Sequence, residues 1–141
     1  MKKLLLLFVC LFAFSTFSFA DDKPISFGQL PERAKVFIKK HFPVTDVQKV
    51  FVDDEEYEVR LKTGVKIEFG KHGRWKEIES KKRPLPKSLV PAPILKDIRH
   101  KYGSSVQVLE ISRDEDEVEV KLTNGKELKM DRKTKDVELD D

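Results

Sequence analysis

Cysteine is nearly absent from this sequence of 141 residues, because Cys10 is the only one. A single thiol forms no disulfide and no thiolate cluster for zinc within one chain. The three histidines, His41, His72 and His100, lack the short spacing of a metal-binding pair. No Gly-x-Ser-x-Gly motif marks a serine hydrolase either. We therefore expect a protein that is not an enzyme.

An excess of charge of one sign is also missing. The chain carries 28 basic and 25 acidic residues, a formal net charge of +3. Because a nucleic-acid-binding protein normally presents a strongly basic face, we expect no nucleic-acid partner. The hydrophobic fraction of 39% is sufficient for a packed core, which argues against a disordered chain. The length suits one compact domain or two small ones.

The one long hydrophobic run covers residues 4–14, directly after two lysines and before small residues that end at Ala20. This order is typical of a secretory signal peptide, and the run is too short to span a bilayer. We therefore predict a signal peptide over residues 1–20, cleaved near Ala20. The expected product is periplasmic or secreted, without stable membrane insertion after cleavage, and it no longer contains Cys10.

The rest of the chain repeats itself. The pattern that begins at Leu30-Pro31 returns at Val90-Pro91, with one residue inserted near Ser104-Ser105. Chance similarity would not keep apolar and turn residues aligned over so long a stretch. We therefore predict two tandem units, over residues 21–80 and 91–141, joined by a linker rich in proline and lysine at residues 81–90. Matched pairs include Ile38 with Ile98, Phe42 with Tyr102, Leu61 with Leu122, Gly64 with Gly125, and Ile78 with Leu139.

Each unit opens with a helical pattern. Pro31 suits the first position of a helix, and Pro43 ends the stretch. In the second unit the helix begins at Pro91 or Pro93, and Gly103 is a suitable C-terminal cap. The apolar residues with helical spacing are Ala34, Phe37, Ile38 and Phe42 in the first unit and Ile94, Leu95, Ile98 and Tyr102 in the second.

Alternating apolar and charged residues follow each helix and predict strands. Thr63-Gly64 and Asn124-Gly125 mark tight hairpins between them. The expected fold class is α+β, with two tandem units of a helix plus an antiparallel sheet. Helices cover one sheet face and water the other. The units either join their sheets edge to edge or share a core. The predicted strands cover residues 47–52, 57–61, 65–69, 74–78, 106–111, 118–122, 128–130 and 136–139.

Four short motifs follow one another in the first unit: His41-Phe42-Pro43, residues 57–64, Ile67-Glu68-Phe69 and Gly73-Arg74-Trp75. Their order and duplication behind a signal peptide resemble the PepSY-like family of exported bacterial proteins, also called beta-lactamase-inhibitor-like. The resemblance covers nearly all of the mature chain. It implies a fold similar to beta-lactamase inhibitor protein in the periplasm or cell envelope. Calcium regulation has been suspected for members, and the resemblance supplies no functional residues.

The second unit departs from this pattern. Gly103 stands where the first unit has Pro43, and Lys135-Asp136 stands where it has Arg74-Trp75. The two units therefore need not present equivalent surfaces.

Acidic residues gather at matching places, between the first and second predicted strands of each unit. Clustered carboxylates offer the oxygen ligands that calcium requires, although neither stretch has the Asp-x-Asp-x-Asp-Gly spacing of a calcium loop. The alternative is a pair of solvated turns whose charges keep sheet edges from pairing with other chains. The candidate calcium ligands are Asp53, Asp54, Glu55, Asp114, Glu115 and Asp116.

The sheet face away from the helices is predicted to carry basic and acidic side chains. Such a face favours an envelope protein or peptide as partner through electrostatic complementarity, or it is an ordinary solvated surface. Trp75 is either an anchor for that partner or a core residue. The sequence thus predicts a non-catalytic exported binding or regulatory module, inhibitor-like, with a calcium-responsive periplasmic protein as the alternative. The candidate partner-binding residues are Arg60, Lys62, Trp75, Lys121 and Lys129.

Overall fold

The computed structural model describes residues 22–140, so the predicted signal peptide lies outside the described residues. None of the helices within this range is long and apolar enough to cross a membrane. The elements in chain order are β1 (Lys23–Ile25), η2 (Phe27–Gln29), α2 (Glu32–His41), η3 (Val44–Asp46), β2 (Val47–Asp53), β3 (Glu56–Leu61), β4 (Lys66–Phe69), β5 (Trp75–Glu79), η4 (Lys87–Leu89), α3 (Ala92–Tyr102), β6 (Val108–Arg113), β7 (Glu117–Leu122), β8 (Glu127–Asp131) and β9 (Val137–Leu139).

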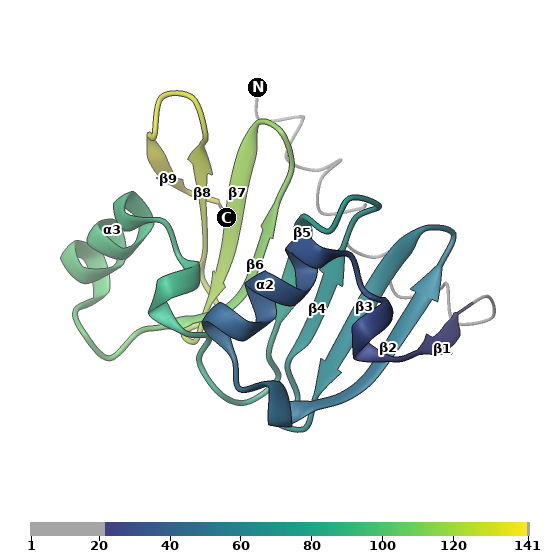
Figure 1. Cartoon of the computed structure of the whole chain (residues 1–141). Helices are drawn as coiled ribbons and strands as arrows, with labels where there is room; N and C mark the ends of the chain where they lie inside the picture. The colour runs from purple at the N-terminus through teal and green to yellow at the C-terminus, as the bar shows by residue number, and fades with distance from the viewer. Residues whose placement is uncertain (1–21, 141) are drawn as a thin grey trace.

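The strands form a single antiparallel sheet in which spatial order follows chain order from β1 to β9 (Figure 1). The predicted α+β class and the antiparallel sheet are confirmed. β5 pairs with β6, where Ile78 lies opposite Ile111, so the sheet runs without a break from one half of the chain to the other. The sequence analysis did not predict β1, because three residues around Pro24 are too short to show an alternating pattern.

Both helices end for local reasons visible in the sequence. In α2 the Phe42 N–H donates to the Ile38 carbonyl, and Pro43 cannot continue the ladder. In α3 the chain turns out at Gly103, whose φ of 78° is readily adopted by glycine. Pro31 and Pro91 immediately precede the first helical residues. The helices therefore occupy the predicted stretches.

The core lies between the helices and one face of the sheet. A row of apolar residues crosses all strands from β2 to β9 by direct cross-strand pairing, so both helices cover the same face. Helix residues Ala34, Ile38, Ile94 and Ile98 are buried against it. The row consists of Val50, Val59, Ile67, Ile78, Ile111, Val120, Leu128 and Leu139.

The segment between the two halves is packed rather than free. Leu85, Leu89 and Val90 are buried, and the Leu85 N–H donates to the Val108 carbonyl at 2.8 Å. The Ser88 hydroxyl lies 2.9 Å from Nδ1 of His41 at the end of α2. These contacts hold the segment against β6 and the end of α2. The domain boundaries proposed from the sequence remain a prediction.

Candidate functional site

The sheet face opposite the helices carries a continuous row of polar side chains, and we call this surface the open face. Because Val59, Ile67 and Ile78 point to the helices, the residues beside them in each strand point away. The central row consists of Glu58, Glu68, Glu77, Ser112, Glu119 and Lys129, each directly opposite the next.

Glutamates dominate the middle of the open face. Glu58, Glu68 and Glu77 lie opposite one another on β3, β4 and β5. Like charges at directly opposed positions destabilise a sheet. Burial raises the pKa of the Glu68 carboxyl above its usual range, and the Glu58 carboxylate adds to the shift. Burial, with Glu68 and Glu79 nearby, raises the pKa of Glu77 to about 8. Ionisation of these carboxyl groups therefore costs stability.

The next row along the strands mixes both signs of charge. Lys66 pairs with Glu79 at 3.0 Å, and Glu79 lies opposite Glu110 at the β5–β6 junction. Burial raises the pKa of Glu110, and the neighbouring Glu79 raises it further. Acidic groups thus also meet where the two halves of the chain join.

Side chains of the open face are less exposed to solvent than the sequence analysis predicted. Glu119 is only 5% exposed, and the Lys129 side chain is 11% exposed. The alternating pattern assigns polar residues to the outer face without showing what stands beside them. Here long side chains from the adjoining strands, together with Asp140 after β9, surround Glu119.

Four of the five sequence-predicted partner residues lie on the open face, and Trp75 does not. Arg60 forms an ion pair with Glu58, and Lys129 pairs with Glu117 at 3.5 Å and Glu138 at 3.1 Å. Lys62 and Lys121 are exposed.

Trp75 lies on the helix side instead. Its ring is 6.1 Å from that of Phe37 on α2 and it packs against the core, which supports the core interpretation of this residue. It borders a groove of about 320 Å³ between the two halves, lined also by His41, Leu89, Arg113 and Arg132. Burial lowers the pKa of Arg113 to about 10, with Arg132 and Arg74 contributing.

The two acidic turns differ in conformation and lie apart. In the β2–β3 turn, Asp54 and Glu55 both have positive φ, 47° and 67°. In the β6–β7 turn, one oxygen of Asp114 accepts hydrogen bonds from the Asp116 and Glu117 N–H groups at 2.8 Å. Four strand spacings, roughly 19 Å, separate the turns, so the six predicted ligands are not brought together.

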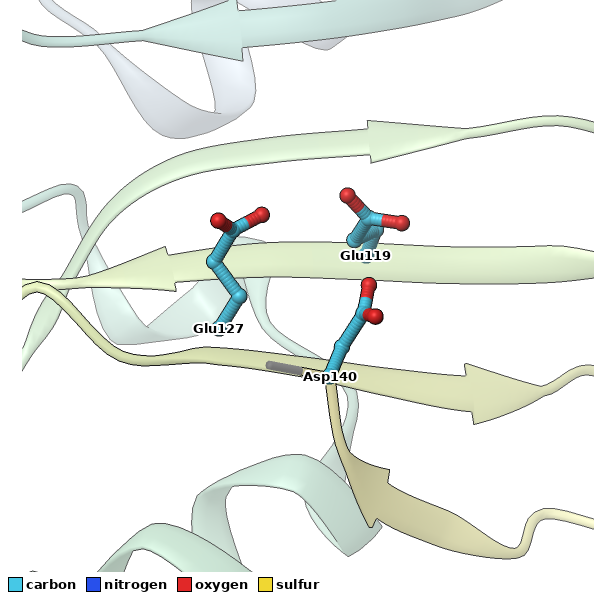
Figure 2. A group of neighbouring side chains, drawn as sticks. All are labelled: Glu119, Glu127 and Asp140. Atoms are coloured by element: carbon cyan, nitrogen blue, oxygen red, sulfur yellow. The ribbon is translucent and has the colours of Figure 1, made fainter. Parts of the chain in front are cut away.

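A group of three carboxylates was missed by the sequence analysis. Glu119 on β7, Glu127 on β8 and Asp140 after β9 bring one oxygen each to within 4.8 Å of the others (Figure 2). The hairpin at Asn124-Gly125 places the two glutamates near each other. Only the β8–β9 pairing brings in Asp140, whose N–H donates to the Glu127 carbonyl. A strand over residues 136–139 was predicted, but its pairing with β8, which brings Asp140 to the two glutamates, was not.

An antiparallel sheet covered by helices on one face, with a charged open face on the other, is the architecture of this chain. The family model described as "Putative beta-lactamase-inhibitor-like, PepSY-like" matches residues 20–67 and 55–135. The chain belongs to this PepSY-like family, and the resemblance found in the sequence is confirmed.

Solved structures agree with this assignment. A "putative periplasmic protein" from Bacteroides vulgatus is 38% identical, with a TM-score of 0.77 over 86% of this chain and 98% of its own. A "putative calcium-regulated periplasmic protein" from Bacteroides thetaiotaomicron is also 38% identical, with a TM-score of 0.75 over 84% and 98%. A second Bacteroides vulgatus protein, of unknown function, is 28% identical, with a TM-score of 0.75 over 85% and 99%. No match was found among curated proteins.

Proposed function

We propose that this chain is a non-catalytic periplasmic module that binds a protein or peptide through the open face. The family and its periplasmic relatives fit a module without catalysis. The observation that carries the proposal is the row of Glu58, Glu68 and Glu77, held directly opposite one another on the face that neither α2 nor α3 covers. The Oε2 atom of Glu68 is buried and has no hydrogen-bond partner among the described residues.

The charge of the glutamate row indicates which kind of partner would bind there. Opposed carboxylates cost stability in the free protein, and Lys or Arg side chains brought by a partner relieve that cost on binding. The partner therefore presents a basic segment to β3–β5. The exposed Lys62 and Lys121 lie beyond this acidic centre and attract acidic groups at the rim of the contact. Charge arranged in this way steers the encounter and fixes the orientation of the partner.

Capture from cell-envelope extract tests the proposal. The bait is the exported protein, and the test variant carries Glu58→Gln, Glu68→Gln and Glu77→Gln. A matched control carries Glu32→Gln, Asp54→Asn and Glu115→Gln at exposed positions away from the open face. A protein retained by the wild type and the control but lost by the test variant supports the proposal. Direct binding of that protein should weaken with salt. Equal capture by all three baits contradicts it.

The basic residues predicted from the sequence are tested separately. Replacing Arg60, Lys62, Lys121 and Lys129 by Gln should weaken binding less than the acidic variant, because Arg60 and Lys129 already serve ion pairs within the chain. The control replaces Lys39, Lys40, Lys96 and Arg99, which are exposed on the helices. A larger loss with the open-face basic variant than with the acidic one would place the contact on the basic residues.

Calcium response is the second candidate function. It is supported by the relative from Bacteroides thetaiotaomicron, which is described as calcium-regulated. The duplicated acidic turns supply the carboxylates, and binding there should order the turns by neutralising their charge. A calcium-dependent rise in melting temperature that Asp53→Asn with Asp114→Asn abolishes would support this site. A response that survives both substitutions would exclude it.

We also infer that the chain consists of two tandem units, over residues 21–80 and 91–141. A helix followed by four strands occurs twice in the chain order, which supports this division.

A further inference from the structure

The three carboxylates at the β7–β9 end of the open face have the spacing of ligands around one ion. Their nearest oxygens lie within 4.8 Å of one another. Two oxygens on opposite sides of a calcium ion are roughly 4.6 to 5.2 Å apart, whereas the corresponding span for magnesium is about 4.0 to 4.2 Å. One calcium ion can therefore contact all three groups, and oxygens at the upper end of this range are too far apart for magnesium.

Two carboxylate oxygens at this place lack a hydrogen-bond partner among residues 22–140. Glu119 is 5% exposed, and its Oε2 atom has no hydrogen-bond partner in the described structure. The Oδ2 atom of Asp140 is in the same situation. A buried acceptor without a donor costs free energy, and such atoms are uncommon in folded proteins. Ser112, directly opposite Glu119 on β6, adds a buried hydroxyl oxygen that is also without a partner.

Among the described residues, no lysine or arginine forms an ion pair with any of the three carboxylates. Lys129, opposite Glu119, forms its ion pairs with Glu117 and Glu138. Lys121 lies opposite Glu127 and is exposed to solvent. Three carboxylates so close together repel one another unless a proton or a cation joins them.

We propose that Glu119, Glu127 and Asp140 form a calcium-binding site on the open face. Figure 2 shows the three groups gathered from neighbouring segments onto one side of the sheet. Carboxylates that each supply one or two oxygens, completed by water, satisfy the ligand number that calcium requires. The inference goes beyond the proposed partner contact, which lies on β3–β5, and it uses none of the residues of the acidic turns.

Calorimetric titration of the exported protein with calcium chloride, and separately with magnesium chloride, tests the site. We expect one calcium ion per chain, a rise in melting temperature with calcium, and a weaker response to magnesium. Glu119→Gln keeps the shape of the side chain but removes its charge, and it should weaken calcium binding at least tenfold. Without calcium this variant should melt at or above the wild-type temperature, because a buried charge has been removed.

Two control proteins make the result specific. Glu77→Gln removes another glutamate from the open face and should leave calcium binding unchanged while it weakens capture of a partner. Asp53→Asn with Asp114→Asn should also leave binding at this site unchanged, which distinguishes it from calcium binding at the acidic turns. If Glu119→Gln does not fold, Asp140→Asn near the chain end replaces it. No calcium response in the wild type, full binding by the Glu119 or Asp140 variant, or loss of binding in either control would overturn the proposal.

Discussion

The guanidinium group of Arg113 lies 3.9 Å above the centre of the Trp75 ring, and its Nε donates a hydrogen bond to the Trp75 carbonyl at 2.9 Å. Trp75 begins β5 and Arg113 ends β6, so the pair connects the two strands at which the halves of the sheet meet. The contact lies near one end of a short pairing that includes Ile78 and Ile111.

Arg113→Ala should therefore destabilise the protein. Loss of the cation–π contact and of the hydrogen bond together costs about 2 kcal/mol. The stability of Arg113→Lys should fall between those of the wild type and Arg113→Ala, because lysine keeps the charge but lacks the fixed Nε–H donor. Thermal unfolding followed by circular dichroism measures the effect, with Arg99→Ala on the exposed side of α3 as control. Equal melting of the alanine variant and the wild type would show that the junction does not depend on this pair.

The stability of the protein should decrease as the pH rises from acidic to alkaline values, because of Glu77. Its pKa of about 8 in the folded state exceeds the ordinary value of 4.5, so the folded state retains a proton that the unfolded chain has lost. Burial raises the pKa of Glu77 most, Glu68, Glu79 and Glu110 raise it further, and Lys66 lowers it.

Glu77→Gln should remove this dependence. We expect the variant to match the wild type in urea unfolding at pH 4.5 and to exceed it by about 1 kcal/mol at pH 8.5, after allowance for solvent screening. Glu115→Gln at an exposed turn is the control. A constant difference between variant and wild type at both pH values would mean that Glu77 titrates normally.

Gly73 and Gly64 provide a matched pair of substitutions. Both have positive φ, 85° and 94°, so alanine is strained at either position. At Gly73 a Cβ would also lie 2.9 Å from Cβ of Pro31 and 3.1 Å from the Ala34 nitrogen, whereas at Gly64 it would meet nothing within 4 Å. Gly64→Ala should cost about 1 kcal/mol and Gly73→Ala distinctly more. Chemical denaturation measures the stability lost in each variant. Equal losses would show that the start of α2 shifts to make room for the new Cβ at position 73.

The β2–β3 turn should gain stability from an Asn-Gly sequence. Asp54 and Glu55 adopt positive φ in succession, a conformation that asparagine and glycine prefer. Asp54→Asn with Glu55→Gly should raise stability by about 1 kcal/mol, although it removes the exposed pair of Glu55 and Lys71. The same replacement at Glu115 and Asp116, neither of which has positive φ, should give no gain. A calorimetric comparison of the two variants decides this.

Most of the sheet followed from the sequence. The alternation around Val59, Ile67 and Val120 fixed which residues face the helices, because a shift of one residue would turn the whole apolar set outward. The helices followed from apolar spacing and from the prolines at their ends. The turn residues Gly64 and Gly125 both adopt the positive φ expected of tight hairpins.

The candidate calcium site could not be predicted from the sequence. Nothing in the spacing of Glu119, Glu127 and Asp140 suggests that they meet, because their proximity depends on the pairing of a three-residue strand. A period-two pattern also cannot show that Glu119 is buried, since burial depends on the side chains of neighbouring strands. Charge conflicts between strands, such as Glu68 opposite Glu77, likewise require the register.

The two ends of the sheet limit its growth by addition of further strands. β1 and β9 are each three residues long, and β1 contains Pro24, which has no N–H to donate. A tenth strand from another molecule would gain few backbone hydrogen bonds at either edge. A sheet of nine strands with long edges would be a template for fibres, whereas these short edge strands favour discrete molecules.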